Sequence, residues 1–242
     1  MWNTLIFSVI GIIFGLVLGS FYNVLIYRVP KGISLVNPKR SFCPVCNHQL
    51  AWKDNIPILS YLILGGKCRY CGSKISPIYP VIEGSTAALF LLAVFLTSNI
   101  WNMLALWILF SGGIIVTAID LQTMMIPDFA VIMTAVGGVL WAIANGQVLL
   151  SLISAGIGFG IFLIIHFVSK QGMGFGDVEY IAALALYLVP FSLVWAILIA
   201  SIAAIIFALP MLITRKANRK TRVPFGPFLA LGVSIAIFIP WR

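Results

Sequence analysis

The chain has 242 residues, of which 62% are hydrophobic and only 9% are charged. One soluble core of this length cannot bury so large an apolar share, so the composition excludes an ordinary globular domain, and it equally excludes a disordered, coiled-coil or collagen-like chain. Lys and Arg residues number 15 against six acids. Because apolar stretches recur along the whole chain, we interpret this excess as a signal of membrane orientation and not of nucleic-acid binding.

The apolar stretches are each long enough to cross a hydrocarbon layer about 30 Å thick as a helix. Residues 178–214 would be about 55 Å long as one helix, so we expect them to form two spans that turn near Pro190. The sequence therefore predicts an all-α integral membrane protein. Its eight transmembrane helices are expected at residues 5–26, 80–97, 102–119, 128–145 and 148–168, twice within 178–214, and at 224–241.

A single long polar stretch, residues 27–78, follows the first span and contains many basic residues but only one acid, Asp54. Loops rich in Lys and Arg stay in the cytoplasm. This places the N-terminus outside, and eight crossings return the C-terminus to the outside as well. We expect two parts, residues 1–97 with the polar loop and residues 98–242 with six helices.

All four cysteines lie in this loop, in the pairs Cys43–Cys46 and Cys68–Cys71, with 21 residues between the pairs. Two Cys-x2-Cys pairs let four thiolates surround one tetrahedral ion, as in a structural zinc site. Two disulfides are the alternative, but a cytoplasmic loop lies in a reducing compartment. A redox Cys-x-x-Cys usually occurs singly. His48 could replace one ligand, although an exposed loop histidine is the simpler interpretation.

Acidic residues are so few that each one can be considered in turn. Asp120 ends the third expected span, and Asp177 follows Gly174-Phe175-Gly176 at the start of the sixth, both at the expected cytoplasmic edge. A carboxylate at such depth costs about 2.5–3.5 kcal/mol and is functional by default. Two adjacent carboxylates share one proton, so one can activate a water molecule while the other protonates the scissile carbonyl, as in aspartic proteases.

Two other acids compete for these roles. Asp128 follows Asp120 by eight residues, but Pro127 interrupts the helix between them, so we favour a cap or turn role at the start of the fourth span. Glu179 lies about 200° around a helix from Asp177 and should point away from the pair. A partnership of Glu179 with Lys170 or a loop arginine is an equally good interpretation.

Several sequence blocks together resemble the prepilin peptidases, GxGD-type aspartyl proteases that also act as N-methyltransferases in type IV pilus, competence and type II secretion systems. The resemblance spans nearly the whole chain. The blocks are residues 19–30 (GSFYNVLIYRVP), the two cysteine pairs, residues 54–57 (DNIP), residues 75–80 (ISPIYP) before Glu83, Ile119-Asp120, residues 126–128 (IPD), the GFGD segment 174–177, and residues 223–230 (VPFGPFLA).

The resemblance implies that Asp120 and Asp177 are the catalytic aspartates. It also implies that the basic leader of a prepilin or pseudopilin is removed at the cytoplasmic face of the bacterial inner membrane, and that the new N-terminal amine is methylated from S-adenosylmethionine. In the family the cysteine-bearing N-terminal part is associated with methyl transfer. One departure is Pro77, where many relatives carry arginine.

Methyl transfer needs a site for a charged cofactor and a neutral amine. Ser20, Asn23 and Tyr27 share one face of the first span, where hydrogen bonding between helices is as good an interpretation as ligand contact. No G-x-G-x-x-G turn occurs, so a Rossmann-type methyltransferase is not indicated. The candidate cofactor-binding residues near the cytoplasmic face are Asn23, Arg28, Tyr79 and Glu83.

A second hypothesis from another functional class is a transporter or channel. In that case Asp120, Asp128 and Asp177 would form a proton or cation path, and the zinc loop would be a docking module. Transporters often have paired broken helices in corresponding halves, and this sequence shows no such symmetry. A third hypothesis is a peptidase that cleaves without methylating.

Overall fold

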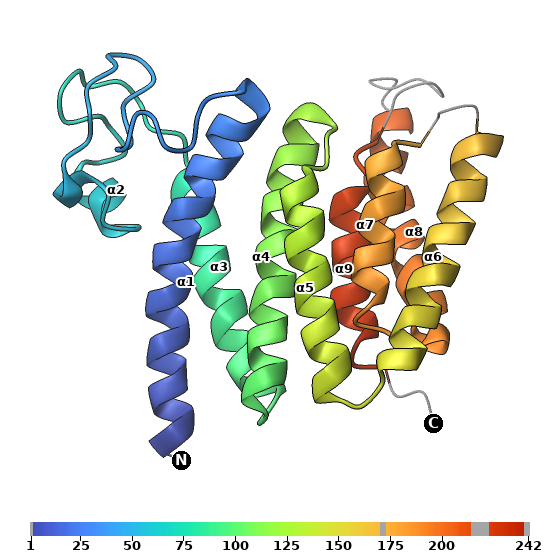
Figure 1. The fold of residues 1–242 in the computed structure, drawn as a ribbon. Helices are drawn as coiled ribbons and strands as arrows, with labels where there is room; N and C mark the ends of the chain where they lie inside the picture. Colours follow the sequence, from blue (N-terminus) through green and yellow to red (C-terminus); the bar gives the residue numbers. More distant parts are fainter. Residues whose placement is uncertain (1, 170–172, 214–222, 240–242) are drawn as a thin grey trace. The chain divides into compact units, whose positions relative to one another are not determined.

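The computed structural model describes residues 2–169, 173–213 and 223–239. Within these residues the structure is helical, and its only β-structure is two isolated antiparallel bridges in the loop after the first helix. The expected all-α fold is confirmed. The helices are α1 (Trp2–Arg28), α2 (Leu59–Ile63), α3 (Ile78–Leu96), α4 (Ile100–Thr123), α5 (Asp128–Ala144), α6 (Val148–Val168), α7 (Phe175–Ala185), α8 (Pro190–Ile213) and α9 (Gly226–Ala236) (Figure 1).

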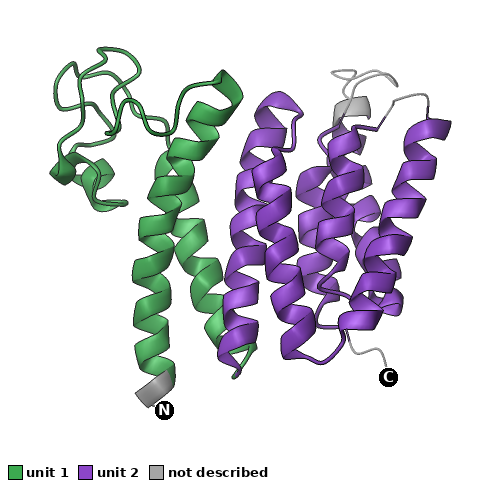
Figure 2. Ribbon diagram, in the orientation of Figure 1, with its two compact units in different colours: residues 1–98 green, residues 99–242 purple. Residues whose placement is uncertain are grey.

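The chain divides into two compact units (Figure 2). Unit 1, Met1–Ser98, contains α1, the long loop with α2, and α3. Unit 2, Asn99–Arg242, contains α4 to α9. We describe each unit by itself.

Among the residues that the structure describes, five helices are long and apolar enough to cross a membrane, namely α1, α3, α4, α6 and α8. Helix α5 has 17 residues, and α7 and α9 have 11 each. A helix of 11 residues is about 16 Å long, roughly half the hydrocarbon thickness. The structure therefore supports a multi-pass protein with five candidate spans and does not confirm eight. The sixth expected span is short because a turn after α7 leads to Pro190, which begins α8.

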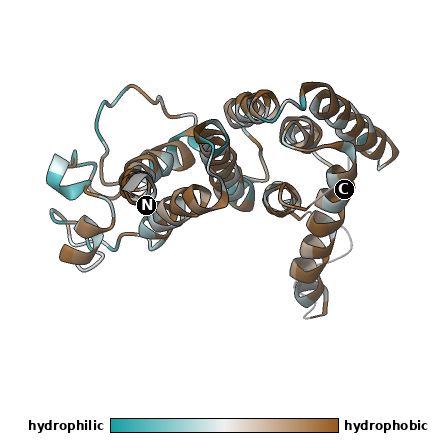
Figure 3. Cartoon of the chain, turned by 90° about the horizontal axis from the view of Figure 1, so that it is seen from below, coloured by the Kyte–Doolittle hydropathy of each residue, from teal (hydrophilic) through white to brown (hydrophobic). Residues whose placement is uncertain are grey.

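Large apolar side chains remain exposed on the long helices, for example Ile13 on α1, Ile164 on α6 and Ile206 on α8. The hydrophilic residues gather mainly in the loop between α1 and α3 (Figure 3). Water would penalise such an extended apolar exterior, whereas lipid tails match it. The surface therefore agrees with the membrane setting that the composition predicts.

In unit 1, α1 and α3 pack at two glycines. A Cβ atom on Gly15 would lie 2.5 Å from Cα of Ala87, and one on Gly19 would lie 2.7 Å from Cα of Glu83. Residues four apart share one helix face, so this Gly-x-x-x-Gly pair lets two backbones approach where any side chain would separate them.

In unit 2, α4 packs against α5 and α9, while α7 packs against α5, α6 and α9. Because consecutive helices run in opposite directions, the turn after α4 and the starts of α7 and α9 lie at the same end of the unit (Figure 1). At the core of the unit, the hydroxyl group of Tyr187 donates a hydrogen bond of 3.1 Å to the carbonyl oxygen of Ala105 in α4. This packing fixes the helices whose ends carry the candidate acids.

Candidate active site

Asp120 lies in the last turn of α4, and only 4% of the residue is exposed. Its Oδ2 atom accepts a 3.0 Å hydrogen bond from the backbone N–H of Gly226, the first residue of α9. Helix N-termini carry unsatisfied N–H groups and a partial positive charge, so they stabilise and orient a carboxylate. A carboxyl group at the end of one helix is thus held by the beginning of another, 106 residues away.

Asp177 lies in the first turn of α7, whose N-cap is Gly174. A Cβ atom on Gly174 would lie 3.3 Å from Asp177 Oδ2, so the carboxyl group lies over this glycine. A Cβ atom on Gly176 would lie 3.1 Å from Cβ of Ile126, in the turn between α4 and α5. Both glycines of the GFGD segment therefore stand where a side chain would crowd the carboxyl group or the neighbouring turn.

Ile126 connects the surroundings of the two acids. Its Cδ1 atom would lie 3.2 Å from a Cβ atom on Gly226, and its Cβ atom faces Gly176. The starts of α7 and α9 thus meet the same side chain. Two carboxyl groups that are distant in sequence therefore lie at one end of unit 2.

The other acids of unit 2 lie in different surroundings. Asp128 is the first residue of α5 and is exposed, which agrees with a turn or cap position. Glu179 is half-buried in α7, and Lys170, its suggested partner, lies outside the described residues. His166, to which we assign no catalytic role, pairs its Nδ1 atom with the carbonyl oxygen of Met173 at 2.8 Å.

The four cysteines of the unit 1 loop form one cluster. Their Sγ atoms all lie within 4.8 Å of one another, and none of the four is in a disulfide. The Sγ atoms of Cys43 and Cys71 are 3.9 Å apart. Zinc–sulfur bonds of about 2.3 Å in a tetrahedron place sulfur atoms about 3.8 Å apart. The four cysteines can therefore bind a metal ion.

The two cysteine pairs have the same backbone geometry. In the first, the N–H of Asn47 donates to the carbonyl of Cys43; in the second, the N–H of Gly72 donates to the carbonyl of Cys68. Asn47 and Gly72 both adopt positive φ, 56° and 71°. Asn and Gly are the residues that most readily adopt this conformation. The local sequence therefore specifies two equivalent turns that bring the thiols together.

The protonation of the cluster depends on its neighbours. Burial of the Cys43 thiol opposes ionisation, but hydrogen bonds from the backbone of Cys46 and Val45 and from Ser73 lower its pKa to about 6. At Cys46 a backbone hydrogen bond from His48 favours the thiolate, yet burial and interactions with the neighbouring thiols raise its pKa to about 11. Negative charge on one sulfur therefore opposes negative charge on the next, and a bound cation relieves this repulsion.

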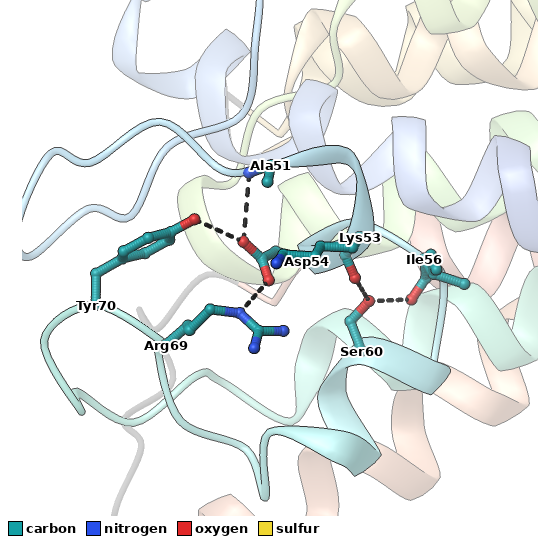
Figure 4. Close-up of polar contacts among 7 residues, drawn as sticks. All are labelled: Ala51, Lys53, Asp54, Ile56, Ser60, Arg69 and Tyr70. Carbon is teal, nitrogen blue, oxygen red and sulfur yellow. Dashed lines mark hydrogen bonds and ion pairs between the residues drawn. The ribbon is translucent and has the colours of Figure 1, made fainter.

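Asp54 connects the second cysteine pair to the preceding segment (Figure 4). Its Oδ1 atom accepts a 2.7 Å bond from Nε of Arg69, and its Oδ2 atom accepts bonds from the Tyr70 hydroxyl at 3.0 Å and the Ala51 N–H at 3.3 Å. Burial raises the pKa of Asp54, but the bonds from Arg69 and Tyr70 outweigh this effect and lower it overall. Asp54 is therefore an ionised anchor for the Cys68–Cys71 turn.

The four candidate cofactor-binding residues have specific protein contacts. Arg28 ends α1, and its buried guanidinium donates to the carbonyls of residues 34, 35, 38 and 40, which fixes the first part of the loop. Asn23 donates to the carbonyl of Tyr79 at 3.1 Å. Glu83 is buried and accepts a 2.7 Å bond from the N–H of Ile58.

A cavity of about 490 Å³ lies between α1 and the loop of unit 1. Its lining includes Phe21 and Arg28 of α1 together with Lys39, Trp52 and Asn55 of the loop. Of the four candidate residues, only Arg28 is in this lining; Asn23, Tyr79 and Glu83 lie beside it, where α1 meets α3. The cavity combines basic, amide and aromatic groups, the mixture that usually orients a small polar ligand.

Sequence reasoning missed three features of these sites. The Gly15–Gly19 pair could have been found from its Gly-x-x-x-Gly spacing in an apolar helix. The N–H of Gly226, which binds Asp120, lies within the VPFGPFLA block, but a backbone donor leaves no signal of its own in the sequence. The loop side of the cavity has no sequence signal either, because its residues meet only after the loop folds.

Comparison with known proteins gives two family matches. Residues 13–97 match the bacterial peptidase A24 N-terminal domain, and residues 107–209 match the type IV leader peptidase family. No solved structure matches the chain.

Similar curated proteins cover most of the chain. A prepilin leader peptidase/N-methyltransferase of Klebsiella pneumoniae is 37% identical, with 84% of this chain and 92% of the relative covered. One from Aeromonas salmonicida is 32% identical, with coverage of 93% and 88%. A type 4 prepilin-like proteins leader peptide-processing enzyme of Escherichia coli O78:H11 is 36% identical, with coverage of 96% and 93%.

Proposed function

This chain belongs to the type IV leader peptidase family, and we propose that it removes the leader peptide from type IV prepilins or pseudopilins and methylates the N-terminus that cleavage exposes. The observation that supports the peptidase half is that Asp120 and Asp177 lie at one end of unit 2, where Ile126 contacts the starts of both α7 and α9. Because the chain belongs to this peptidase family, we no longer retain the hypothesis of a transporter or channel. We assign peptide cleavage to residues 98–242 and methyl transfer to residues 1–97.

In the proposed mechanism, Asp120 and Asp177 hold one proton between them, because two adjacent carboxylates do not both ionise easily. The ionised member removes a proton from the attacking water, and the protonated member donates its proton to the oxygen of the scissile carbonyl. Water adds to the carbonyl carbon, and the C–N bond then breaks as the amine takes the proton that was removed from the water. A hydroxyl proton of the tetrahedral intermediate passes to the other aspartate, which restores the shared proton. The hydrogen bond from Gly226 keeps Asp120 oriented throughout.

The proposed membrane arrangement has eight crossings, with both termini outside and the aspartates facing the cytoplasm of a bacterial inner membrane. Helices α7 and α9 are short, and their N-termini carry Asp177 and the Gly226 donor. A prepilin with an apolar stem in the bilayer and a short basic leader would present its scissile bond at this depth. The basic residues of the unit 1 loop support the assigned side.

We further propose that the bound metal is zinc and that its role is structural. Four cysteine ligands complete a tetrahedral zinc site and leave no position for water or substrate. The loop around them contains few buried apolar residues, so metal binding would supply much of its folding free energy. The expected consequence is that the metal supports the unit 1 cavity and takes no part in either reaction.

The residues of unit 1 fit S-adenosylmethionine as the methyl donor. The cavity of about 490 Å³ is within the usual range for small-ligand sites. Lys39 and Arg40 offer positive charge to the donor's carboxylate, Arg28 holds the loop that carries them, and Trp52 and Phe21 offer aromatic surface. When bound, the donor supplies an electrophilic methyl group; the protein must hold the amine deprotonated and exclude water.

The test is cleavage of a synthetic prepilin by purified protein, with mass spectrometry of the product N-terminus. Asp120→Asn and Asp177→Asn should each lower kcat by at least about 10²–10⁴-fold, the contribution of a positioned acid or base. Asp128→Asn is the matched control and should retain cleavage. Cleavage that survives in either dyad variant would overturn the assignment, and a product without an added methyl group would limit the function to cleavage.

A further inference from the structure

Ile58 has a backbone conformation that its side chain disfavours. Its φ and ψ angles are 59° and −48°, and the N–H of Leu59 bonds to the carbonyl of Pro57, which defines a γ-turn with positive φ. This turn is rare and strained, and a β-branched residue at positive φ is an outlier. Such a conformation persists only where the surrounding structure holds it.

The group that holds Ile58 is the carboxylate of Glu83. The strained turn directs the Ile58 N–H at Oε2 of Glu83, 2.7 Å away, and Glu83 is 7% exposed. Helix α3 itself is fixed at this point, because Cα of Glu83 lies against Gly19 of α1. Within the described residues Glu83 forms no ion pair, and the groups that face its carboxylate are the Ile58 N–H and the side chains of Ser20 and Asn23.

The turn at Ile58 ends the segment that closes one side of the cavity. Ala51, Trp52, Asn55 and Pro57 line the cavity from residues 51–58, opposite the side chains of α1. Two carboxylates restrain this segment. Asp54 binds it to the second cysteine turn, and Glu83 binds its end to α3.

We propose that Glu83 is a positioning residue for the methyl-donor cavity: through the Ile58 N–H it holds residues 51–58 as the cavity wall, and it does not contact the donor itself. This inference rests on the proposed methyl transfer and refines the cofactor-binding role that the sequence suggests for Glu83. Ser20 also faces the Glu83 carboxylate from the cavity lining, so the acid lies directly behind the wall.

The proposal requires an acceptor oxygen at position 83 and does not require a negative charge. Glutamine keeps a carbonyl oxygen that can accept the Ile58 N–H, whereas alanine removes the acceptor. Glycine at position 58 adopts positive φ without strain, so it should make the turn less dependent on position 83. A residue that bound the donor's cationic groups by charge would lose affinity equally in both variants, and Ile58→Gly would not restore it.

The experiment measures binding of S-adenosylhomocysteine to the full-length protein by calorimetry, together with prepilin cleavage and methylation. We expect Glu83→Gln to stay within about threefold of wild type and Glu83→Ala to bind at least about tenfold more weakly, the size expected when a buried N–H loses its acceptor. Adding Ile58→Gly to Glu83→Ala should restore most of the affinity. Gly84→Ala, whose Cβ would lie 3.7 Å from Ile58 Cδ1, is the matched control and should bind as wild type does.

Cleavage at wild-type rate shows that unit 2 of a variant is intact, because the dyad belongs to unit 2, and an unchanged melting temperature shows that unit 1 is folded as well. Equal loss of binding in Glu83→Gln and Glu83→Ala, or no rescue by Ile58→Gly, would overturn the positioning role. If Glu83→Ala does not fold, loss of binding in a Glu83→Gln variant that still cleaves decides against the proposal. A wild-type protein that cleaves but neither binds nor methylates would instead refute the proposed methyl transfer, and this inference with it.

Discussion

Gly226→Ala is the substitution that tests the geometry of the dyad without altering either acid. The new Cβ atom would lie 2.8 Å from Cγ1 of Val116, 3.0 Å from Oδ2 of Asp120 and 3.2 Å from Cδ1 of Ile126. Val116 is completely buried, so it cannot move aside. The start of α9 must therefore shift by at least a few tenths of an ångström, and the N–H bond to Asp120 lengthens.

The expected cost combines two effects. Overpacking a filled core costs about 1–3 kcal/mol in stability. Weakening a hydrogen bond to a charged group costs about 1.5–3 kcal/mol. If the weakened hydrogen bond raises the free energy of the transition state by this amount, kcat falls by about 10- to 150-fold.

The assay is steady-state cleavage of a synthetic prepilin, with thermal unfolding of the same preparations. Gly113→Ala is the matched control, because it introduces the same methyl group between α4 and α9 but its Cβ would lie 3.4 Å from Cβ of Ala230, an ordinary contact. We expect the control to cleave at close to the wild-type rate. Equal rates for both variants would refute the role of the Gly226 donor.

Three further predictions concern unit 1. In Gly19→Val the new Cβ atom would lie 2.7 Å from Cα of Glu83, so the substitution should separate α1 from α3, lower the melting temperature and abolish methylation. Gly84→Ala is the control and should change neither the melting temperature nor methylation. The pKa of Asp54 is lower in the folded protein than its unfolded-state value of about 3.9, so the ionised carboxylate stabilises the fold above that pH. This contribution disappears as the pH falls from about 3.9 through the lowered pKa of the folded protein. The difference in melting temperature between wild type and Asp54→Asn should therefore be constant near neutral pH and vanish in acid. Cys43→Ser should release the metal, measured by elemental analysis, and should reduce methylation more than cleavage, so equal losses would contradict the division of labour.

Local sequence patterns are sufficient to predict the helical membrane fold and the cysteine cluster of this protein. The length and composition of the apolar runs predict a helical membrane protein, because a span must satisfy its own backbone hydrogen bonds and needs a definite number of residues. The two Cys-x2-Cys pairs similarly predict the cluster in which all four Sγ atoms lie within 4.8 Å, since each pair is organised by its own turn and four thiolates are the ligand set of one tetrahedral ion. Hydropathy predicts eight spans but does not show where α7 and α9 end, and the structure gives these two helices 11 residues each.

Tertiary structure decided which distant groups meet. The sequence marks Asp120 and Asp177 as unusual acids in apolar surroundings, but only the packing of α4, α7 and α9 brings their neighbourhoods together and gives Asp120 the N–H of Gly226. The same holds for Glu83, which sequence reasoning considered as a ligand of the cofactor and which the fold directs at the backbone of Ile58. Residue type and spacing specify chemistry that acts within a few residues along the chain, whereas a hydrogen bond between segments 25 or 106 residues apart depends on how whole helices pack.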